Sequence, residues 1–457
     1  LVPALDEGAL SAACLRFIGG CENVAGEMLE QDFELLRDAG NLGSIMKFND
    51  DEGYLKMLRC HYEDWTNGGM DDCPYDIKLL LPGVRVILAL TEKYHALIAN
   101  PPYMGRGHMT SVLSNYLDKN YPNAKSDLFS TFMDMMLDRT IDNGKTAFIT
   151  MESWMFLSSF EKFRKNIIDN YHIASLGHFG WHIIGIAFGT AMTVIDKCKS
   201  NGRKGVYSYL TIDDIDREKN VPFVYPKKDN GRFAIVEQKN FEKIPGCPIG
   251  YWVSENMIKA FDKKSFISDL AISNGQNITG DNKRFIRLFW EVNNINVNKD
   301  YWAFCARGGG FRRYYGNVDN VILWTRSAKT FYHKDPIARI IPEELQFKSG
   351  ITWSYICSGN PSFRKLHETE TFEKAGTSIF IKDKDKLSSL LAFLNSIVAK
   401  EMFKIIAPTL NYQVRDIFSL PISDKIFSVT VNIRLEDSYS ISKQDWDAHE
   451  TSWDFQR

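Results

Sequence analysis

The stretch Ala96-Leu97-Ile98-Ala99-Asn100-Pro101-Pro102-Tyr103 decides how the rest of the chain is interpreted. Its first half is an apolar run that predicts a short buried strand. The two prolines end that strand, because proline lacks a backbone N–H and fixes φ. A residue before proline is held in extended geometry, so we expect Asn100 at the strand's carboxyl end with its amide projecting. Open α/β sheets bind ligands at these ends, so the stretch predicts a ligand site.

The residue types at this strand end suit a planar amine. An amino group on a nucleobase is a poor nucleophile, because its lone pair is delocalised into the ring. Two acceptors, the Asn100 side-chain oxygen and the Pro101 carbonyl, can hold its two N–H bonds and favour a tetrahedral, nucleophilic nitrogen. Tyr103 offers a face on which a flipped base can stack. Taken alone, these residues are also compatible with a proline-rich turn after a strand.

The Asn100–Tyr103 motif resembles the catalytic motif of amino-group DNA methyltransferases of the N6-adenine type. The similarity extends well beyond this motif, to the PglX methyltransferase family of BREX phage-defence systems, and it covers nearly the whole chain. The segments that carry it are 99–105 (ANPPYMG), 125–132 (KSDLFSTF), 149–163 (ITMESWMFLSSFEKF), 244–252 (IPGCPIGYW), 350–354 (GITWS), 408–421 (PTLNYQVRDIFSLP) and 450–455 (ETSWDF).

The resemblance implies a DNA adenine-N6 methyltransferase that flips an adenine out of double-stranded DNA and methylates it from S-adenosylmethionine, alongside other BREX defence proteins. The catalytic residues would be Asn100, Pro101, Pro102 and Tyr103, with no covalent nucleophile and no metal. Two alternatives stay open. One is a type IIG restriction-modification enzyme, which needs a PD-x-E/D-x-K nuclease that we do not find in the sequence. The other is a recognition module that binds DNA or a defence partner and is inactive on its own.

The cofactor elements of the family precede its Asn-Pro-Pro-Tyr strand: a glycine loop for S-adenosylmethionine and an acidic residue for its ribose. Residues 1–90 show apolar positions at helical spacing instead. The pair Gly19-Gly20 follows such a helical pattern and fits a helix end. We therefore expect an internal fragment or a truncated gene, and weak or absent S-adenosylmethionine binding by residues 1–457.

The expected fold class is α/β, with a partial Rossmann-like methyltransferase sheet followed by a mixed α+β target recognition domain. Strands predicted over 146–151, 173–179 and 190–196 alternate with helices, which implies a parallel sheet. The resemblance adds that its last strand inserts antiparallel. Residues 386–406 predict one long helix, stopped by Pro408. The expected domains are a helical segment 1–90, a catalytic half 91–200, a charged linker 201–240, a recognition domain 241–423 and a polar tail 424–457.

Two aromatic residues, Phe179 and Trp181, follow the 173–179 strand, where the family packs residues around the flipped base. They are candidates for a second stacking face, and the alternative is an aromatic hairpin end. Basic residues of the recognition domain are candidates for DNA contact, since arginine pairs with guanine edges or phosphates. The alternative for them is a solvated face. These residues are Lys283, Arg284, Arg307, Arg312 and Arg313.

The net charge of −2 means that any DNA contact must come from local basic patches. The eight cysteines form no C-x-x-C pair and no zinc spacing, so free thiols in a reducing cytoplasm are expected. The pair His178 and His182 lacks the helical motif of a metal site. The apolar run 77–90 is too short and too interrupted to span a bilayer, so no membrane partner is expected.

Overall fold

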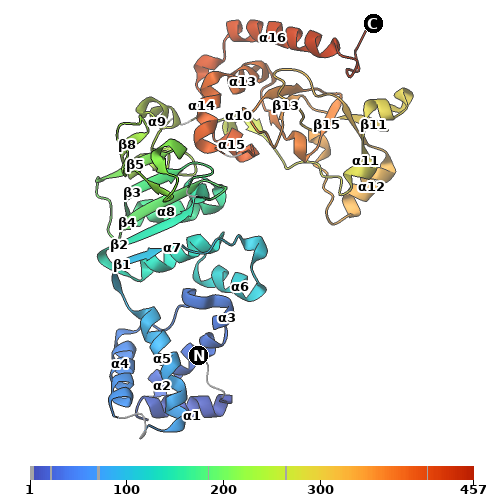
Figure 1. Ribbon diagram of the computed structural model, residues 1–457. Helices are drawn as coiled ribbons and strands as arrows, with labels where there is room; N and C mark the ends of the chain where they lie inside the picture. The colour runs from blue at the N-terminus through green and yellow to red at the C-terminus, as the bar shows by residue number, and fades with distance from the viewer. Residues whose placement is uncertain are drawn as a thin grey trace. The chain divides into compact units, whose positions relative to one another are not determined.

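The computed structural model describes residues 5–20, 23–68, 73–183, 185–262, 265–408 and 410–456. The chain divides into two compact units, Leu1–Phe241 and Glu242–Arg457, both drawn in Figure 1. Each unit contains helices and strands, so the predicted α/β class is confirmed. Within the described ranges, no helix combines the length and apolar character that crossing a membrane requires.

The first unit begins with helices, as the apolar spacing predicts. They are α1 (Glu7–Phe17), α2 (Asn23–Arg37), α3 (Ala39–Leu42), α4 (Glu52–Asn67) and α5 (Tyr75–Thr91). Gly19 and Gly20 adopt positive φ values of 82° and 75° directly after α1. The Gly20 N–H donates to the Leu15 carbonyl at 2.9 Å. This left-handed ending satisfies a carbonyl of the last helical turn, so the helix-end interpretation of the glycine pair is confirmed.

A six-stranded sheet follows, with strand order β1-β2-β4-β3-β5-β8. β1 pairs with β2 in parallel, and β4 lies antiparallel between β2 and β3. The predicted antiparallel insertion is therefore confirmed. Helix α7 packs against β2 and α8 against β3. The bounds are β1 (Tyr94–Ala99), α6 (Ser111–Asn120), α7 (Leu128–Asp138), β2 (Thr140–Met151), α8 (Glu161–Asn170), β3 (His172–Phe179), β4 (Thr190–Asp196), β5 (Lys204–Leu210) and β8 (Phe233–Glu237).

The strand that carries the Asn-Pro-Pro-Tyr motif is not buried, which corrects the sequence prediction. β1 is an edge strand of the sheet and pairs only with β2 in the described structure. Its side chains are exposed or half-buried along its whole length, and Ile98 is 83% exposed. An apolar run identifies a strand but does not say how many neighbours cover it.

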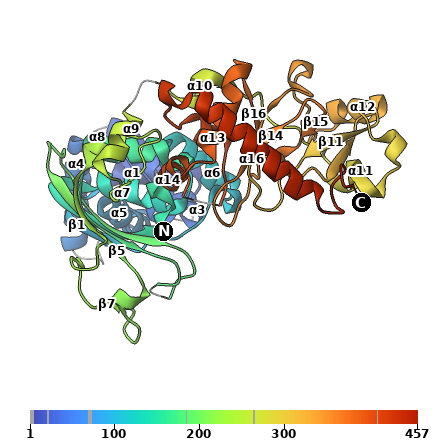
Figure 2. The same ribbon diagram turned by 90° about the horizontal axis from the view of Figure 1, so that it is seen from above.

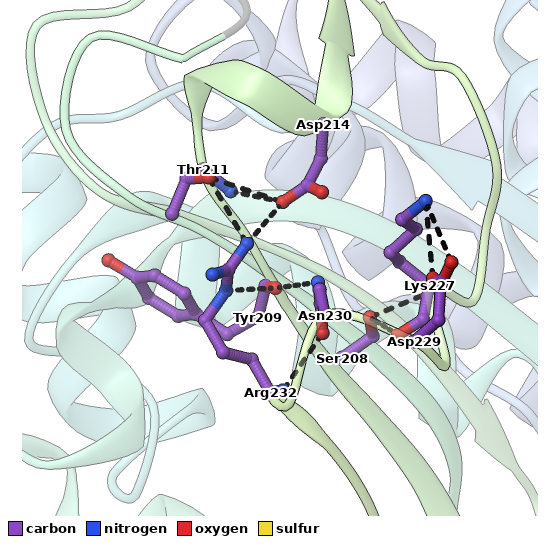
Figure 3. Close-up of polar contacts among 8 residues, drawn as sticks. All are labelled: Ser208, Tyr209, Thr211, Asp214, Lys227, Asp229, Asn230 and Arg232. Atoms are coloured by element: carbon purple, nitrogen blue, oxygen red, sulfur yellow. Dashed lines mark hydrogen bonds and ion pairs between the residues drawn. The ribbon is translucent and has the colours of Figure 1, made fainter.

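Residues 201–240 are not a linker. β5 pairs in parallel with β3, and β8 pairs antiparallel with β5, so the segment extends the sheet. The chain between them holds the short hairpin β6 (Ile215–Asp216) and β7 (Val221–Pro222), which projects from the sheet in Figure 2. Figure 3 shows how the hairpin is tied down: Arg232 pairs with Asp214 at 2.7 Å, and Asn230 donates to the Tyr209 carbonyl at 3.2 Å. Charged residues that suggested a linker thus form ion pairs with one another inside the segment, as Arg232 and Asp214 do.

The second unit contains two four-stranded sheets, ordered β10-β12-β11-β15 and β14-β13-β16-β9. Its largest buried cluster joins the second sheet to the last helices of the chain. The bounds are α9 (Glu255–Phe261), α10 (Ile267–Leu270), β9 (Ala271–Ile272), α11 (Asn282–Phe285), β10 (Ile286–Leu288), β11 (Trp302–Ala306), β12 (Asn320–Leu323), α12 (Arg326–Lys334), β13 (Gly350–Trp353), β14 (Phe363–Leu366), β15 (Glu370–Phe372), β16 (Ser378–Ile381) and α15 (Val414–Phe418).

One prediction for the end of the chain is wrong. The expected single helix is broken into α13 (Leu387–Leu394) and α14 (Ile397–Ile406). The break arises because Asn395 donates to the Phe363 carbonyl at 2.9 Å, while Ser396 caps α14 through the Ala399 N–H. The expected tail contains the long helix α16 (Val429–Asp447), which packs on α13.

Candidate active site

The Asn-Pro-Pro-Tyr motif leaves β1 at its carboxyl end, as predicted, and Asn100 is exposed there. The Tyr103 hydroxyl lies 3.1 Å from the Asn100 side-chain oxygen and 3.1 Å from the Ile149 carbonyl of β2. Burial raises the pKa of Tyr103, so this hydroxyl keeps its proton near neutral pH. A hydroxyl has one proton to donate, so it serves one of these two acceptors at a time. The tyrosine therefore orients the Asn100 amide without permanently occupying its oxygen.

Asp127 fixes the other side of the loop. Its Oδ1 accepts from the Met104 N–H at 3.0 Å and from the Phe129 N–H at 3.2 Å. The Leu128 N–H in turn donates to the Met104 carbonyl at 3.0 Å. One buried carboxylate thus caps α7 and binds the motif loop to the start of that helix. Burial raises the pKa of Asp127, although the hydrogen bonds from backbone N–H groups act in the opposite direction.

Aromatic rings gather around Tyr103. Its ring meets Phe129 edge-on at 6.1 Å and Phe188 edge-on at 5.7 Å, and Phe129 lies 5.4 Å from Phe160. Phe188 is half-buried and comes from the loop that leads into β4. Phe129 and Phe160 are buried, so they support the other two rings from below, and the half-buried Tyr103 and Phe188 are the rings that reach the surface near Asn100.

Phe188 was not among the residues predicted from the sequence, although the expected topology contained a signal for it. β4 was expected to run antiparallel among parallel strands. The start of such a strand lies at the same edge as the carboxyl ends of its neighbours, and Thr190 of β4 pairs with Met151 at the end of β2. A residue just before β4 is therefore placed near the motif by topology alone.

The two aromatic residues chosen from the sequence lie elsewhere. Phe179 is 3% exposed and packs with Ile183, Leu210 and Ile215 in a buried cluster. The prediction that Phe179 provides a stacking face is wrong, because its ring is enclosed by core side chains. Trp181 is 66% exposed, and its stacking role stays a prediction.

The loop that carries Phe188 rests on a carboxylate. The Glu152 N–H donates to the Gly189 carbonyl at 3.0 Å, and Glu152 Oε2 lies 2.6 Å from His178 Nε2. The His178 ring meets Tyr209 edge-on at 4.9 Å. A Cβ at Gly189 would lie 2.1 Å from the carboxyl carbon of Glu152. A larger residue at position 189 would therefore displace the Glu152 carboxylate from its place beside the loop.

The basic candidates of the second unit fall into two groups. Arg307 faces Glu373 at 3.7 Å, and Arg312 forms an ion pair with Asp445 of α16. Lys283, Arg284 and Arg313 are exposed.

The guanidinium groups of the exposed arginines lie close to neighbouring aromatic rings. Arg284 lies 4.7 Å from the Phe285 ring centre, and Arg313 lies 5.2 Å from that of Phe311. Close packing of the backbone explains the glycine next to Arg307, because a Cβ at Gly308 would lie 2.8 Å from the Ala375 carbonyl oxygen. DNA contact by these basic residues stays a prediction.

The residues described before β1 form helices and short turns, with no strand–glycine turn–helix unit among them. These described residues therefore do not match the glycine loop, or the carboxylate for the ribose, that binding of a methyl donor would need. In the part of the chain that the structure describes, no three His, Cys, Asp or Glu side chains form a group that could hold a metal ion. Seven cysteines are free thiols, and Cys21 lies outside the described residues.

The parallel β1–β2 pair, the antiparallel β4 and the motif at the end of β1 place the first unit in the class of Rossmann-like methyltransferase sheets. Residues 59–183 match the family model of the Eco57I restriction-modification methylase, which includes the motif, α7 and β2.

Two curated relatives extend the similarity to most of the chain. The adenine-specific methyltransferase PglX of Lacticaseibacillus casei (strain Zhang) is 32% identical over 395 residues, or 81% of this chain and 33% of that protein. The adenine-specific methyltransferase BrxX of Escherichia coli O9:H4 (strain HS) is 29% identical over 452 residues, or 94% of this chain and 36% of that protein. The resemblance to PglX proteins is therefore confirmed, and the chain spans about a third of their length.

The fold is also similar to a solved structure, the Type IIL restriction-modification enzyme MmeI in complex with DNA. The TM-score is 0.51 at 13% identity, covering 98% of this chain and 68% of that one. At this level of identity the similarity concerns the fold alone.

Proposed function

We propose that this chain carries the target-base site and a DNA recognition unit of a site-specific DNA adenine-N6 methyltransferase of BREX-type phage defence. The observation that carries the proposal is the motif loop at the carboxyl end of β1. It presents the Asn100 amide and the Tyr103 ring side by side, next to Phe188. The PglX and BrxX relatives, both named as adenine-specific methyltransferases, support adenine as the target.

The chemistry that these residues perform is activation of an exocyclic amine. The Asn100 side-chain oxygen and the Pro101 carbonyl each accept one N–H of the adenine N6 group. As the nitrogen becomes tetrahedral and gains positive charge, both hydrogen bonds strengthen, so they lower the barrier more than they stabilise bound substrate. S-adenosylmethionine supplies the methyl group when bound.

Tyr103 has two parts to play. Its ring, with Phe188 beside it, offers aromatic surface to a base that has left the DNA stack. Its hydroxyl holds the Asn100 amide in position and turns toward the Ile149 carbonyl when the substrate amine takes the Asn100 oxygen. Pro102 follows Pro101 and keeps this turn rigid, because its φ is fixed.

The second unit would bind double-stranded DNA and choose the sequence, with Lys283, Arg284 and Arg313 as the exposed cations available for phosphate or base contact. Other BREX proteins would be its partners. A recognition module without catalysis is the alternative, and the helical character of the described residues before β1 favours it for this chain in isolation.

The test is methyl transfer by the natural protein that contains this chain, using a labelled methyl donor and duplex DNA. Asn100→Ala should abolish incorporation into N6-methyladenine, while DNA binding and thermal unfolding stay as in the parent. Tyr103→Phe is the matched variant: it keeps the ring, loses the hydroxyl and should retain part of the rate. Incorporation by Asn100→Ala at the parental rate would overturn the proposal.

A further inference from the structure

The loop that carries Phe188 meets the motif through one ring contact. The Phe188 ring packs edge-on against the Tyr103 ring at 5.7 Å, and both rings are half-buried. Phe188 lies outside the sheet, since β4 begins at Thr190. Ladder hydrogen bonds of β4 therefore do not fix this ring by themselves, and its position depends on what holds Gly189, the residue between Phe188 and the strand.

Glu152 holds Gly189 through its backbone and through its side chain. The Glu152 N–H donates to the Gly189 carbonyl at 3.0 Å. A Cβ on Gly189 would lie 2.1 Å from the carboxyl carbon of Glu152 and 2.3 Å from each carboxyl oxygen. The carboxylate thus fills the space that a side chain at position 189 would take. Glu152 therefore packs directly against the residue that follows Phe188.

The Glu152 carboxylate is in turn fixed by a neighbouring strand. Its Oε2 lies 2.6 Å from His178 Nε2, and the Glu152 and His178 side chains are 20% and 9% exposed. His178 and Tyr209 are paired positions on the parallel strands β3 and β5, and their rings meet edge-on at 4.9 Å. Burial, together with the negative charge of Glu152, raises the pKa of Tyr209, so a neutral phenol lies beside the pair. A short, largely buried hydrogen bond of this kind keeps a carboxylate in one orientation.

This cluster lies at the same edge of the sheet as the motif. β1 is parallel to β2, β3 is parallel to β5, and β4 is antiparallel to both β2 and β3. The carboxyl ends of these four parallel strands therefore share one edge with the start of β4, and Figure 1 shows the strands side by side. A change at Glu152 can reach Tyr103 through the Phe188 loop alone.

We propose that Glu152 is a positioning residue for the target base: held by His178, it keeps the Phe188 ring beside Tyr103 before a base arrives. This role rests on the proposed function, and Glu152 acts through Phe188. Base binding costs less when the loop is already ordered. Loss of the carboxylate should therefore weaken binding of the extruded base, while the acceptors of Asn100 and Pro101 remain in place.

The experiment is a fluorescence titration of the natural protein that contains this chain with duplex DNA in which 2-aminopurine replaces the target adenine. The parent should increase the fluorescence as the base leaves the stack. Glu152→Ala should weaken this binding about tenfold, within the range that one stacking ring contributes. Glu152→Gln keeps an acceptor for a His178 N–H and should stay within about threefold of the parent. Asp142→Ala, which removes an exposed carboxylate at the other end of β2, is the matched control and should bind as the parent does.

A double-mutant cycle distinguishes positioning from a general loss of stability. In a Phe188→Ala background, Glu152→Ala should weaken binding by less than about twofold, because the ring through which Glu152 acts is gone. Thermal unfolding shows whether each variant is folded. If Glu152→Ala does not fold, Glu152→Asp takes its place in the cycle, since it keeps the charge and is one methylene too short to hold both partners.

Three outcomes would overturn the proposal: parental binding by the folded variant, an equal loss in both backgrounds, or no recovery of binding with Glu152→Gln. Failure of the proposed function looks different. In that case the parent itself would give no fluorescence change, which would remove the target-base site and the role of Glu152 together.

Discussion

Asp127 offers a sharp test of how the motif loop is held. Asp127→Ala removes the acceptor shared by the Met104 and Phe129 N–H groups. Loss of the helix cap costs about 1 kcal/mol. Leaving the Met104 N–H without a partner costs about 1–3 kcal/mol more, less where water can reach it. We therefore expect the first unit to lose about 2–4 kcal/mol of unfolding free energy.

The control for this variant is Asp127→Asn, which keeps one acceptor oxygen, removes the charge and replaces the second carboxyl oxygen with an NH2 group. Because burial raises the pKa of Asp127, ionisation of this carboxyl is unfavourable in the folded protein, and losing it should cost under about 1 kcal/mol. The raised pKa also sets the pH dependence. The contribution of this carboxyl group to the free energy of unfolding falls as the pH rises from its pKa in the unfolded chain to its pKa in the folded protein.

Urea unfolding gives the free energies, and hydrogen exchange of peptides covering 100–132 shows where protection is lost. The Ala variant should also lower the methylation rate by about 100-fold, since small displacements of a positioned group have effects of that size. The reasoning is refuted if the Asn and Ala variants are equally destabilised, or if the Ala variant loses less than about 1 kcal/mol.

Three further predictions concern other side chains. Phe188→Ala should weaken binding of an unstacked base by about 1–3 kcal/mol, read from 2-aminopurine fluorescence in DNA, and an unchanged signal would remove Phe188 from the site. Arg313→Ala should reduce the salt dependence of DNA binding by about one unit of slope, whereas Arg312→Ala should also lower the thermal unfolding temperature, because Arg312 pairs with Asp445. Glu370→Gln should remove a loss of stability that the parent shows between pH 4.5 and about 8. The folded protein binds the extra proton in that window, so stability falls as pH rises, by up to about 1.4 kcal/mol per unit. Equal pH dependence in both proteins would contradict this.

Local sequence patterns predicted the elements around the motif well. The proline pair marked the end of β1, and the glycine pair after α1 was recognised as a helix end. Each of these signals acts over a few residues, through proline's missing donor or a positive φ.

The errors concern contacts between distant segments. The exposure of β1 depends on which strands flank it, and the break between α13 and α14 depends on Asn395 reaching Phe363 on β14. Residues 201–240 resembled a linker because their charges are paired across turns, as between Arg232 and Asp214. The position of Phe188 near the motif follows from the sheet topology, which places the start of β4 beside the end of β2.

We propose that the loop after β1 directs a methyl group to the N6 atom of adenine. The most direct measurement is base-resolved sequencing of chromosomal DNA from cells that express the natural protein containing this chain, compared with cells that express its Asn100→Ala variant. We expect N6-methyladenine at one recurring sequence with the parent and none with the variant. Methylation of cytosine instead, or N6-methyladenine that persists in the Asn100→Ala cells, would contradict it.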